Sequence, residues 1–375
     1  MKYITVIPAF TPNQFSSKAP CSKVSLNRPN HRFYRYGRDA LWVGMGGLGL
    51  GPGDEILVPG ALCDVVLIAM IKRGVGLQYY RLNSMLIPDL GEIEARIGPK
   101  TRAIYVNHYF GRPTRLESLR RLCDVKGLFL IEDCAHALGA HSNGLGVGNT
   151  GDIAIFSYRK FFPILDGGGL LVNSSEISMP EPLAGSGMTT MLRGALKILM
   201  LSLAELGVLP IARCKSVLGD VDAYLSVDDT INIEGWAQPF GGTALSRWMI
   251  EHADLKDVIG KRREHYQYLS DCISTVSNAV PLFPDLDKGQ VPFCFPILLK
   301  NRDALVRYAA KRGVYLEPTL APPYRNISAL VNRGESFPDI DNIAAQLVSI
   351  PVHQTLTKLK LARVWSVIKC GLEKI

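Results

Sequence analysis

The stretch GDIAIFSYRKFFPILDGGGLLVN, residues 151–173, carries the clearest information about the fold of this chain. Residues 153–158 have the apolar, β-branched composition of a buried strand, and a second such run covers residues 170–173. Between them lie three consecutive glycines, residues 167–169. Glycine lacks a Cβ atom, so this cluster permits positive φ angles and the close approach of another backbone. We therefore expect a loop here that holds polar side chains at the end of a buried strand.

Two polar side chains lie at the end of that strand, Ser157 and Lys160. Lys160 is flanked by Tyr158, Phe161 and Phe162, and apolar surroundings favour the uncharged amine that Schiff-base chemistry requires. A lysine taken alone is usually a solvated surface charge. The S-x-x-K spacing at the end of a buried strand instead favours a reactive lysine.

Around this stretch, short β-rich runs alternate with segments of helical periodicity, which is typical of a parallel sheet covered on both faces. Some runs are continuously apolar, as in residues 103–106 and 128–131, which indicates strands buried on both sides. We predict an α/β fold whose large domain has three layers, α/β/α, around a mostly parallel sheet. The expected strands are residues 55–59, 77–82, 103–108, 128–132, 153–158 and 170–173. The expected helices are residues 39–48, 64–73, 89–97 and 116–125.

The composition changes after about residue 225, which predicts a large domain over residues 1–225, with an N-terminal arm of about 30 residues, and a smaller α+β domain over residues 226–375. A polar stretch, residues 226–243, precedes a predicted long helix over residues 244–276. We further expect a surface loop over residues 319–338. The remaining expected elements are strands at residues 293–299 and 314–317 and helices at residues 340–347 and 359–368.

The segment LFLIEDCAHALGA, residues 128–140, delivers Asp133 to the end of another buried strand. Ligands of α/β proteins bind at the carboxyl ends of parallel strands, so this carboxylate is a candidate site residue. Capping a following helix or turn is an equally good explanation of an aspartate there. His136 follows three residues later, but no third ligand with suitable spacing accompanies the pair, and we predict no metal site.

A third candidate lies in YGRDALWVGMGG, where Gly37, Arg38 and Asp39 precede or open a helix. Free backbone N–H groups at a helix N-terminus attract anions, so these residues could hold a phosphate. A plain capping turn is the alternative explanation.

The composition limits the classes of partner. The chain has 375 residues, 47% of them hydrophobic, and a net charge of +8 that is spread along its length, so no nucleic-acid surface is indicated. The eight cysteines never occur as C-x-x-C, which argues against a zinc ribbon and for reduced thiols. The N-terminus lacks the features of an export signal, and we expect a cytoplasmic protein.

One mostly apolar segment, residues 192–212, qualifies that expectation. Arg193, Lys197, Glu205 and Pro210 interrupt it, and its uncharged runs are far shorter than the roughly 20 residues of a spanning helix. A buried or interface helix is favoured over contact with a membrane surface.

Taken together, the motifs resemble the DegT/DnrJ/EryC1/StrS family of sugar aminotransferases, which are fold-type I enzymes dependent on pyridoxal phosphate (PLP). The resemblance extends over most of the chain and follows the order of the motifs. They are GRDALWVGMGGLGLGPGDEILVPG (37–60), PKTRAIYVNHYFGRP (99–113), IEDCAHALGA (131–140), FSYRKFFPILDGGG (156–169) and FPDIDNIAAQLVSIPVHQTLT (337–357).

The resemblance implies a role for each candidate residue. Lys160 would form the Schiff base with PLP and move a proton, Asp133 would pair with the pyridine nitrogen, and His136 would contact the cofactor near its phenolic oxygen. Ser157 and the backbone of residues 37–39 would hold the phosphate. The resemblance also implies an amino donor, usually glutamate, a nucleotide-linked keto-sugar as acceptor, and a homodimer.

Three departures from the family pattern leave alternatives open. Lys160 lies three residues after Ser157, where the usual spacing is five, and the usual position is occupied by Phe162. Cys63 or a neighbour replaces the aromatic residue that stacks on the pyridine ring, and the G-Y-N-Y-R segment has no clear counterpart near residues 239–248. A dehydratase, an enzyme for a non-sugar carbonyl compound and a non-catalytic relative therefore remain alternatives to a sugar aminotransferase for surface polysaccharide or amino-sugar biosynthesis.

Overall fold

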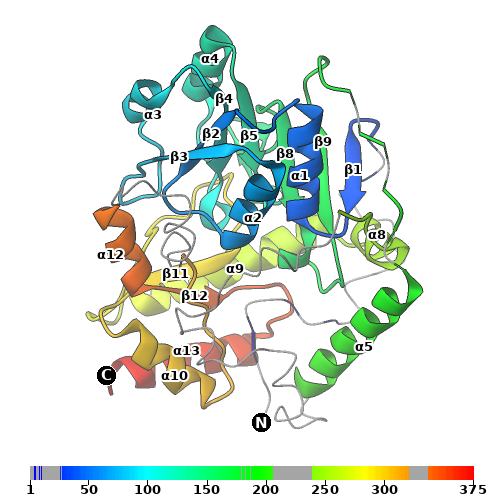
Figure 1. The fold of residues 1–375 in the computed structure, drawn as a ribbon. Coiled ribbons are helices and arrows are strands. Elements are labelled where there is room, and N and C mark those ends of the chain that lie inside the picture. Colours follow the sequence, from blue (N-terminus) through cyan, green and yellow to red (C-terminus); the bar gives the residue numbers. More distant parts are fainter. Residues whose placement is uncertain are drawn as a thin grey trace.

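A computed structural model describes residues 28–205 except 179, 182 and 186, residues 239–320 and 337–375, and five residues nearer the N-terminus (4, 5, 8, 10 and 26). Its centre is a seven-stranded sheet in the order β1-β9-β8-β5-β4-β2-β3 (Figure 1). Its strands are β1 (His31–Tyr34), β2 (Glu55–Pro59), β3 (Gly76–Tyr80), β4 (Thr101–Asn107), β5 (Phe129–Asp133), β8 (Ile153–Ser157) and β9 (Gly168–Val172).

The sheet is parallel except for one strand. β9 runs antiparallel to both of its neighbours, β1 and β8, and the other pairs are parallel. Because parallel strands end at a common edge, β4, β5 and β8 deliver their last residues to the same side of the sheet. Two of the candidate residues, Asp133 and Ser157, are the last residues of β5 and β8.

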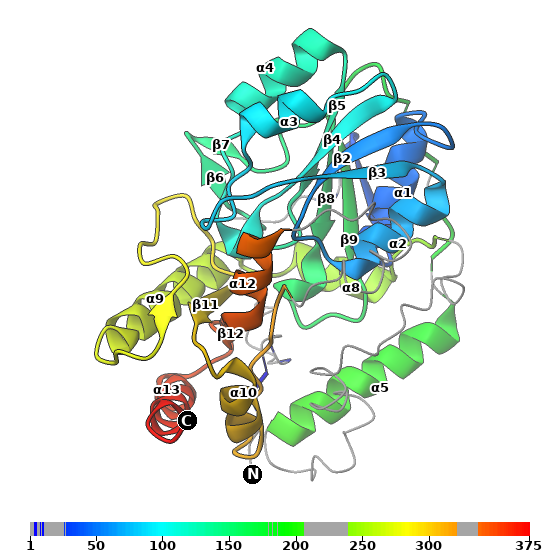
Figure 2. The ribbon, with the colours of Figure 1, turned by 60° about the vertical axis from the view of Figure 1, so that its left-hand side comes forward.

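Helices cover both faces of the sheet, which confirms the three-layer prediction. Figure 2 shows α1 and α2 on one side of the strands and α3 and α4 on the other. Glycine in the left-handed conformation ends α2 at Gly74 (φ 81°) and α4 at Gly127 (φ 65°). The helices are α1 (Gly37–Gly47), α2 (Asp64–Arg73), α3 (Leu90–Arg96) and α4 (Glu117–Lys126).

A second, three-stranded antiparallel sheet, β10-β11-β12, lies beyond the carboxyl edge of the first (Figure 1). Backbone hydrogen bonds join the two parts, since Val291 and Phe293 donate to the carbonyls of Gly111 and Phe110 after β4. The elements of this part are α9 (Leu255–Ile273), β10 (Val280–Pro281), β11 (Cys294–Leu298), α10 (Arg302–Ala310), α12 (Pro338–Gln346), β12 (Leu347–Pro351) and α13 (Lys358–Leu372). The candidate edge therefore faces a junction between two sheets.

The structure corrects several predictions. The helix expected over residues 244–276 is two helices, α8 (Ala244–Glu251) and α9, because Asp254 caps a new start by accepting hydrogen bonds from the Lys256 and Asp257 backbone. Residues 314–317 form only isolated bridges, to Ile4 and Ser349. Three observed elements, β1, β12 and α10, were not predicted from the sequence. The predicted domain boundary near residue 225 and most of the loop 319–338 lie outside the described residues.

The apolar segment begins in α5 (Met188–Glu205), and residues 206–212 lie outside the described residues. Four large apolar side chains of this helix are exposed: Met188, Leu192, Leu196 and Leu199. None of the described helices combines the length and the apolar character that crossing a bilayer requires.

Candidate active site

Asp133 is the last residue of β5 and is almost completely buried. Its Oδ1 accepts a hydrogen bond from the Ala135 backbone (2.8 Å), and its Oδ2 accepts one from the Tyr105 hydroxyl (2.5 Å). Burial, followed by the nearby Asp133 charge, raises the pKa of Tyr105 well above its ordinary value, so the phenol stays a donor. Asn107 lies beside Asp133 on β4, and its buried Oδ1 has no hydrogen-bond partner among the described residues.

His136 is buried three residues beyond Asp133 and stacks on the ring of Phe293, with centroids 4.6 Å apart and planes 11° apart. Burial, and then the nearby charge of Lys160, lowers the pKa of His136 well below its ordinary value. The ring is therefore neutral. Its Nδ1 faces the Phe110 N–H at 3.4 Å, which leaves the proton on Nε2 and makes that atom a hydrogen-bond donor.

Lys160 ends the short 3₁₀ turn, residues Tyr158–Lys160, that follows β8. Its Nζ lies 5.5 Å from the centroid of Phe293, the ring on which His136 stacks. Phe293 thus brings Lys160 and His136 together. The aromatic neighbours of Lys160 in sequence, Phe161 and Phe162, are buried in the core beneath the loop, while Lys160 itself is half-buried.

Arg262, on α9, holds the backbone of Lys160 and was not singled out from the sequence. Its side chain is fully buried and donates to the carbonyls of Lys160 (3.1 Å), Pro292 (3.1 Å) and Phe293 (3.0 Å). Gln354 accepts from Arg262 Nε and donates to the Phe161 carbonyl at 2.7 Å. Burial lowers the pKa of Arg262 to about 9, so it remains charged at neutral pH. The two residues fasten the Lys160 loop to the second part of the chain.

The N-terminus of α1 lies directly beside Ser157. A Cβ atom placed on Gly37 would come within 3.3 Å of the Phe156 carbonyl and 3.9 Å of the Ser157 Cβ. The N–H groups of Gly37 and Arg38 make no hydrogen bond within the described part of the chain, as expected at a helix start. Asp39 differs, because its N–H donates to the Tyr36 carbonyl and its buried carboxylate accepts from the Tyr36 N–H at 3.1 Å. The side chain of Asp39 thus caps the helix.

The glycine cluster shapes this corner in the expected way. A Cβ on Gly168 would lie 2.2 Å from the Tyr36 carbonyl carbon and 2.6 Å from the Gly37 nitrogen. Gly167 has φ 155°, and a Cβ on Gly169 would overlap the Tyr158 hydroxyl at 2.7 Å. Only glycine permits β9 to pass this close beneath the start of α1.

Cys63, the N-cap of α2, is exposed and close enough to Tyr105 to contribute to the raised pKa of that phenol. It therefore lies on the Asp133 side of the edge. His108 does not face the site, since its Nε2 donates to the buried Glu132 carboxylate at 3.1 Å.

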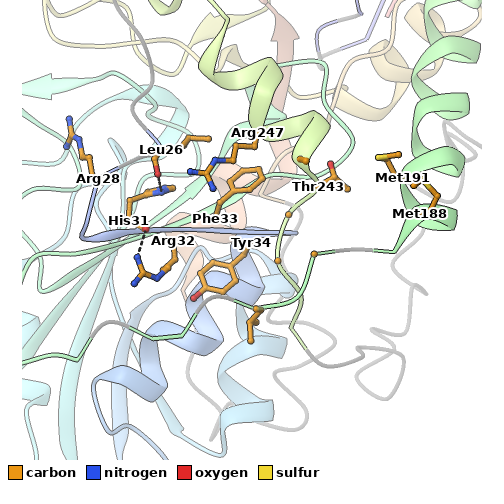
Figure 3. A pocket seen from close by; sticks show the side chains of 15 residues that line it. Leu26, Arg28, His31, Arg32, Phe33, Tyr34, Met188, Met191, Thr243 and Arg247 are labelled. Carbon is orange, nitrogen blue, oxygen red and sulfur yellow. Dashed lines mark hydrogen bonds between the residues drawn. The ribbon is translucent and has the colours of Figure 1, made fainter.

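A separate cavity of about 650 Å³ opens between β1, the start of α5 and α8 (Figure 3). Arg28, Arg32 and Arg247 contribute its basic groups, and Met188 and Met191 of α5 lie at one side. No candidate site residue lines it. The candidate site is therefore identified by the side chains at the carboxyl ends of β5 and β8, and not by this cavity.

The comparison with known families agrees with this arrangement. The pattern of the DegT/DnrJ/EryC1/StrS aminotransferase family matches residues 35–181 and 249–369, well over half of the chain. The chain belongs to this family. The matched ranges leave out residues 182–248, which include α5. They contain all eight candidate residues: Gly37, Arg38, Asp39, Cys63, Asp133, His136, Ser157 and Lys160.

Individual relatives match to different extents. GDP-perosamine synthase of Vibrio cholerae is 35% identical over 143 residues, which are 38% of this chain and 39% of the relative. The dTDP-3-amino-3,6-dideoxy-alpha-D-galactopyranose transaminase of Aneurinibacillus thermoaerophilus is 27% identical over 335 residues, 88% of this chain and 82% of the relative. The Streptococcus pneumoniae protein Spr1654, solved in a PLP form, has a similar fold, with a TM-score of 0.69, 15% identity and 99% coverage of both chains. This likeness confirms the predicted fold class.

Proposed function

We propose that the protein is a PLP-dependent aminotransferase that transfers an amino group, with glutamate as donor, to a nucleotide-linked keto-sugar. One observation carries the proposal. Asp133, His136, Ser157 and Lys160 all lie at, or just after, the carboxyl ends of the neighbouring strands β5 and β8. Both curated relatives are named as enzymes of amino-sugar synthesis.

The residues at this edge fit the proposed cofactor. Gly37 and Arg38 offer free N–H groups and Ser157 a hydroxyl, which together suit a phosphate at a helix N-terminus. Asp133 accepts two hydrogen bonds, and an ionised carboxylate has about four acceptor sites, so it can also hold a protonated pyridine nitrogen. Cys63 lies near Tyr105, whose hydroxyl donates to Asp133, and we propose that Cys63 contacts the face of the ring.

Bound PLP supplies an electron sink for the bonds of the amino carbon. The Lys160 amine would attach the cofactor and then move protons at that carbon, and Arg262 keeps its backbone in place. Asp133, held in place by the Tyr105 hydroxyl and the Ala135 N–H, would pair with the ring nitrogen. His136, neutral and protonated on Nε2, would donate a hydrogen bond to the phenolic oxygen.

The lysine position bears on the alternatives. A relative that has lost the lysine would have no amine beside His136, whereas Lys160 Nζ lies over the same ring that His136 stacks on. This favours transamination over the dehydration and non-catalytic alternatives. We also propose a cytoplasmic homodimer, in which the exposed apolar stripe of α5 is covered by the second copy.

The absorbance spectrum of the purified protein tests this function. Incubation with PLP should give a band near the edge of the visible range, and glutamate should convert it to the spectrum of the aminated cofactor. A panel of nucleotide-linked keto-sugars should then restore the original band. A protein that stays colourless with PLP, or a band that glutamate leaves unchanged, would contradict the proposal.

A further inference from the structure

Three arginines surround the ring of Tyr36 at the start of α1. The guanidinium carbons of Arg35, Arg38 and Arg159 lie 4.7, 4.6 and 4.6 Å from the ring centroid. No two of them can therefore be farther apart than twice 4.7 Å. Arg35 also donates to the Tyr36 hydroxyl at 3.3 Å. Cation–π contact explains how the ring orients the guanidinium groups, but the ring carries no charge that balances three cations.

The cluster has no ion-pair partner in the described part of the chain. No carboxylate there lies within ion-pair distance of Arg35, Arg38 or Arg159, and the Nε atom of each is buried without a hydrogen-bond partner. The charge of Asp166 acts on Arg159 through space, but the Asp166 carboxylate accepts hydrogen bonds from the Thr243 N–H and hydroxyl. Burial lowers the pKa of Arg159. All three arginines are half-buried, and grouping like charges in a partly buried place is costly unless an anion joins them.

The position of the cluster connects it with the proposed site. Arg159 lies between Ser157 and Lys160 in the chain, and Arg38 is the second residue of α1. The same corner already offers neutral donors for one phosphate, namely the Ser157 hydroxyl and the N–H groups of Gly37 and Arg38. A phosphate monoester carries a charge of at most about −2, which the three guanidinium groups and the helix N-terminus exceed.

We propose that Arg35, Arg38 and Arg159 bind the diphosphate of the acceptor substrate, next to the phosphate of the cofactor. This rests on the proposed function and deepens it by assigning a recognition site. Planar guanidinium groups form paired hydrogen bonds with phosphate oxygens, and two linked phosphates offer enough oxygens for three arginines. An acceptor without the diphosphate, such as a free sugar or a sugar monophosphate, would bind far more weakly.

Inorganic pyrophosphate tests the site by titration calorimetry into the PLP-saturated protein. We expect pyrophosphate to bind at least about tenfold more tightly than inorganic phosphate, because it reaches more of the cluster. Arg35→Gln and Arg159→Gln should each weaken pyrophosphate binding about tenfold or more. Arg159→Lys keeps the charge and loses the planar fork, so it should fall between wild type and Arg159→Gln. The absorbance of bound PLP reports separately whether each variant retains its cofactor.

The matched control is Arg102→Gln, which removes one exposed positive charge near the start of β4, at the opposite edge of the sheet. It should bind pyrophosphate like wild type. Equal pyrophosphate affinity in wild type, Arg35→Gln and Arg159→Gln would overturn the site, and so would pyrophosphate that binds only to PLP-free protein. A protein that never forms the PLP band yet binds pyrophosphate through these arginines would overturn the aminotransferase and retain the anion site.

Discussion

Two neighbouring carboxylates at the end of β5 serve opposite purposes. Glu132, on one face of the sheet, has all its acceptor positions occupied. It receives hydrogen bonds from His108 Nε2 and from the backbones of Gly148, Thr150 and Gly151. Asp133, on the other face, receives two, from Tyr105 and Ala135. Successive side chains of a strand point to opposite faces, so these adjacent residues have different surroundings. Glu132 is the completed carboxylate, with no acceptor position left, and Asp133 is the open carboxylate, which can accept further hydrogen bonds.

The completed carboxylate belongs to the scaffold. Burial alone would raise the pKa of Glu132, but the hydrogen bonds of His108, Gly151 and Gly148 outweigh it and lower that pKa. His108 Nδ1 accepts from the Thr114 N–H at 2.9 Å, which fixes the proton on Nε2. Glu132 and His108 therefore bind the loop 148–151 to β4 and β5. Buried acids with unused acceptor positions are the better candidates for chemistry.

The largest expected effect is on the open carboxylate. Asp133→Asn keeps the shape and removes the charge, so turnover should fall on the order of 10²- to 10³-fold, the size of a lost electrostatic contact in a reacting site. Stability should change far less than in the Glu132 variant below. Steady-state kinetics and urea unfolding of the same preparation measure both. A variant that keeps more than a tenth of the wild-type turnover would exclude Asp133 from the site.

The completed carboxylate should respond in the opposite way. Glu132→Gln places an amide NH₂ against donors that need an acceptor, so the free energy of unfolding should fall by about 3–5 kcal/mol. Turnover per folded molecule should stay near wild type. Denaturant titration with active-site counting separates the two quantities. A loss of turnover without a loss of stability would reverse the assignment of the two carboxylates.

His31 extends the comparison to pH, because both of its ring nitrogens are occupied, by the Leu26 carbonyl and the Tyr158 hydroxyl. Burial lowers its pKa to about 4. The unfolded chain therefore binds a proton near pH 6.5 that the folded chain does not bind until about pH 4. Stability should fall by about 3 kcal/mol as the pH drops through that window.

His31→Gln, which cannot titrate, should flatten the loss between pH 6.5 and 4, and the exposed His141→Gln should leave it unchanged. Urea unfolding at several pH values measures the slope. Identical slopes in wild type and His31→Gln would show that His31 does not carry this pH dependence.

The smallest expected effect concerns the backbone beneath the site. Gly168→Ala would place a methyl group 2.2 Å from the Tyr36 carbonyl, so the start of α1 must shift. We expect a loss of roughly 1–3 kcal/mol in stability and weaker PLP binding, measured by absorbance titration. Gly51→Ala meets no atom within 4 Å and should be neutral. Equal PLP affinity in both variants would mean that α1 does not hold the cofactor.

The sequence predicted the core of the fold because its strands and helices carry strong local patterns. The β2 and α2 bounds agree with the predicted ranges, and the other strands of the large sheet that were predicted differ by at most two residues at an end. β1 was missed because its four residues, HRFY, alternate too briefly to give a signal. The break between α8 and α9 was missed because Asp254 looks like an ordinary helix-surface acid until its capping bonds are seen.

For the site, the sequence pointed to residues that lie at strand ends, where position alone is informative. Arg262 gave no such signal, since a cation in a long polar helix usually faces solvent, and only the fold shows that it is buried against Lys160. The contrast between Glu132 and Asp133 was also invisible, because both stand in one motif and differ only in their partners. The backbone N–H groups of the loop 148–151 donate to Glu132, and these tertiary contacts are visible only in the folded structure.

Borohydride reduction of the PLP-treated protein, followed by peptide mass mapping, identifies the amine that holds the cofactor. Reduction makes the bond between the cofactor and that amine permanent, so we predict a pyridoxyl label on Lys160. The label should be lost in Lys160→Ala and kept in the surface variant Lys126→Ala. A label on another lysine with none on Lys160, or no label at all, would show that Lys160 does not hold the cofactor.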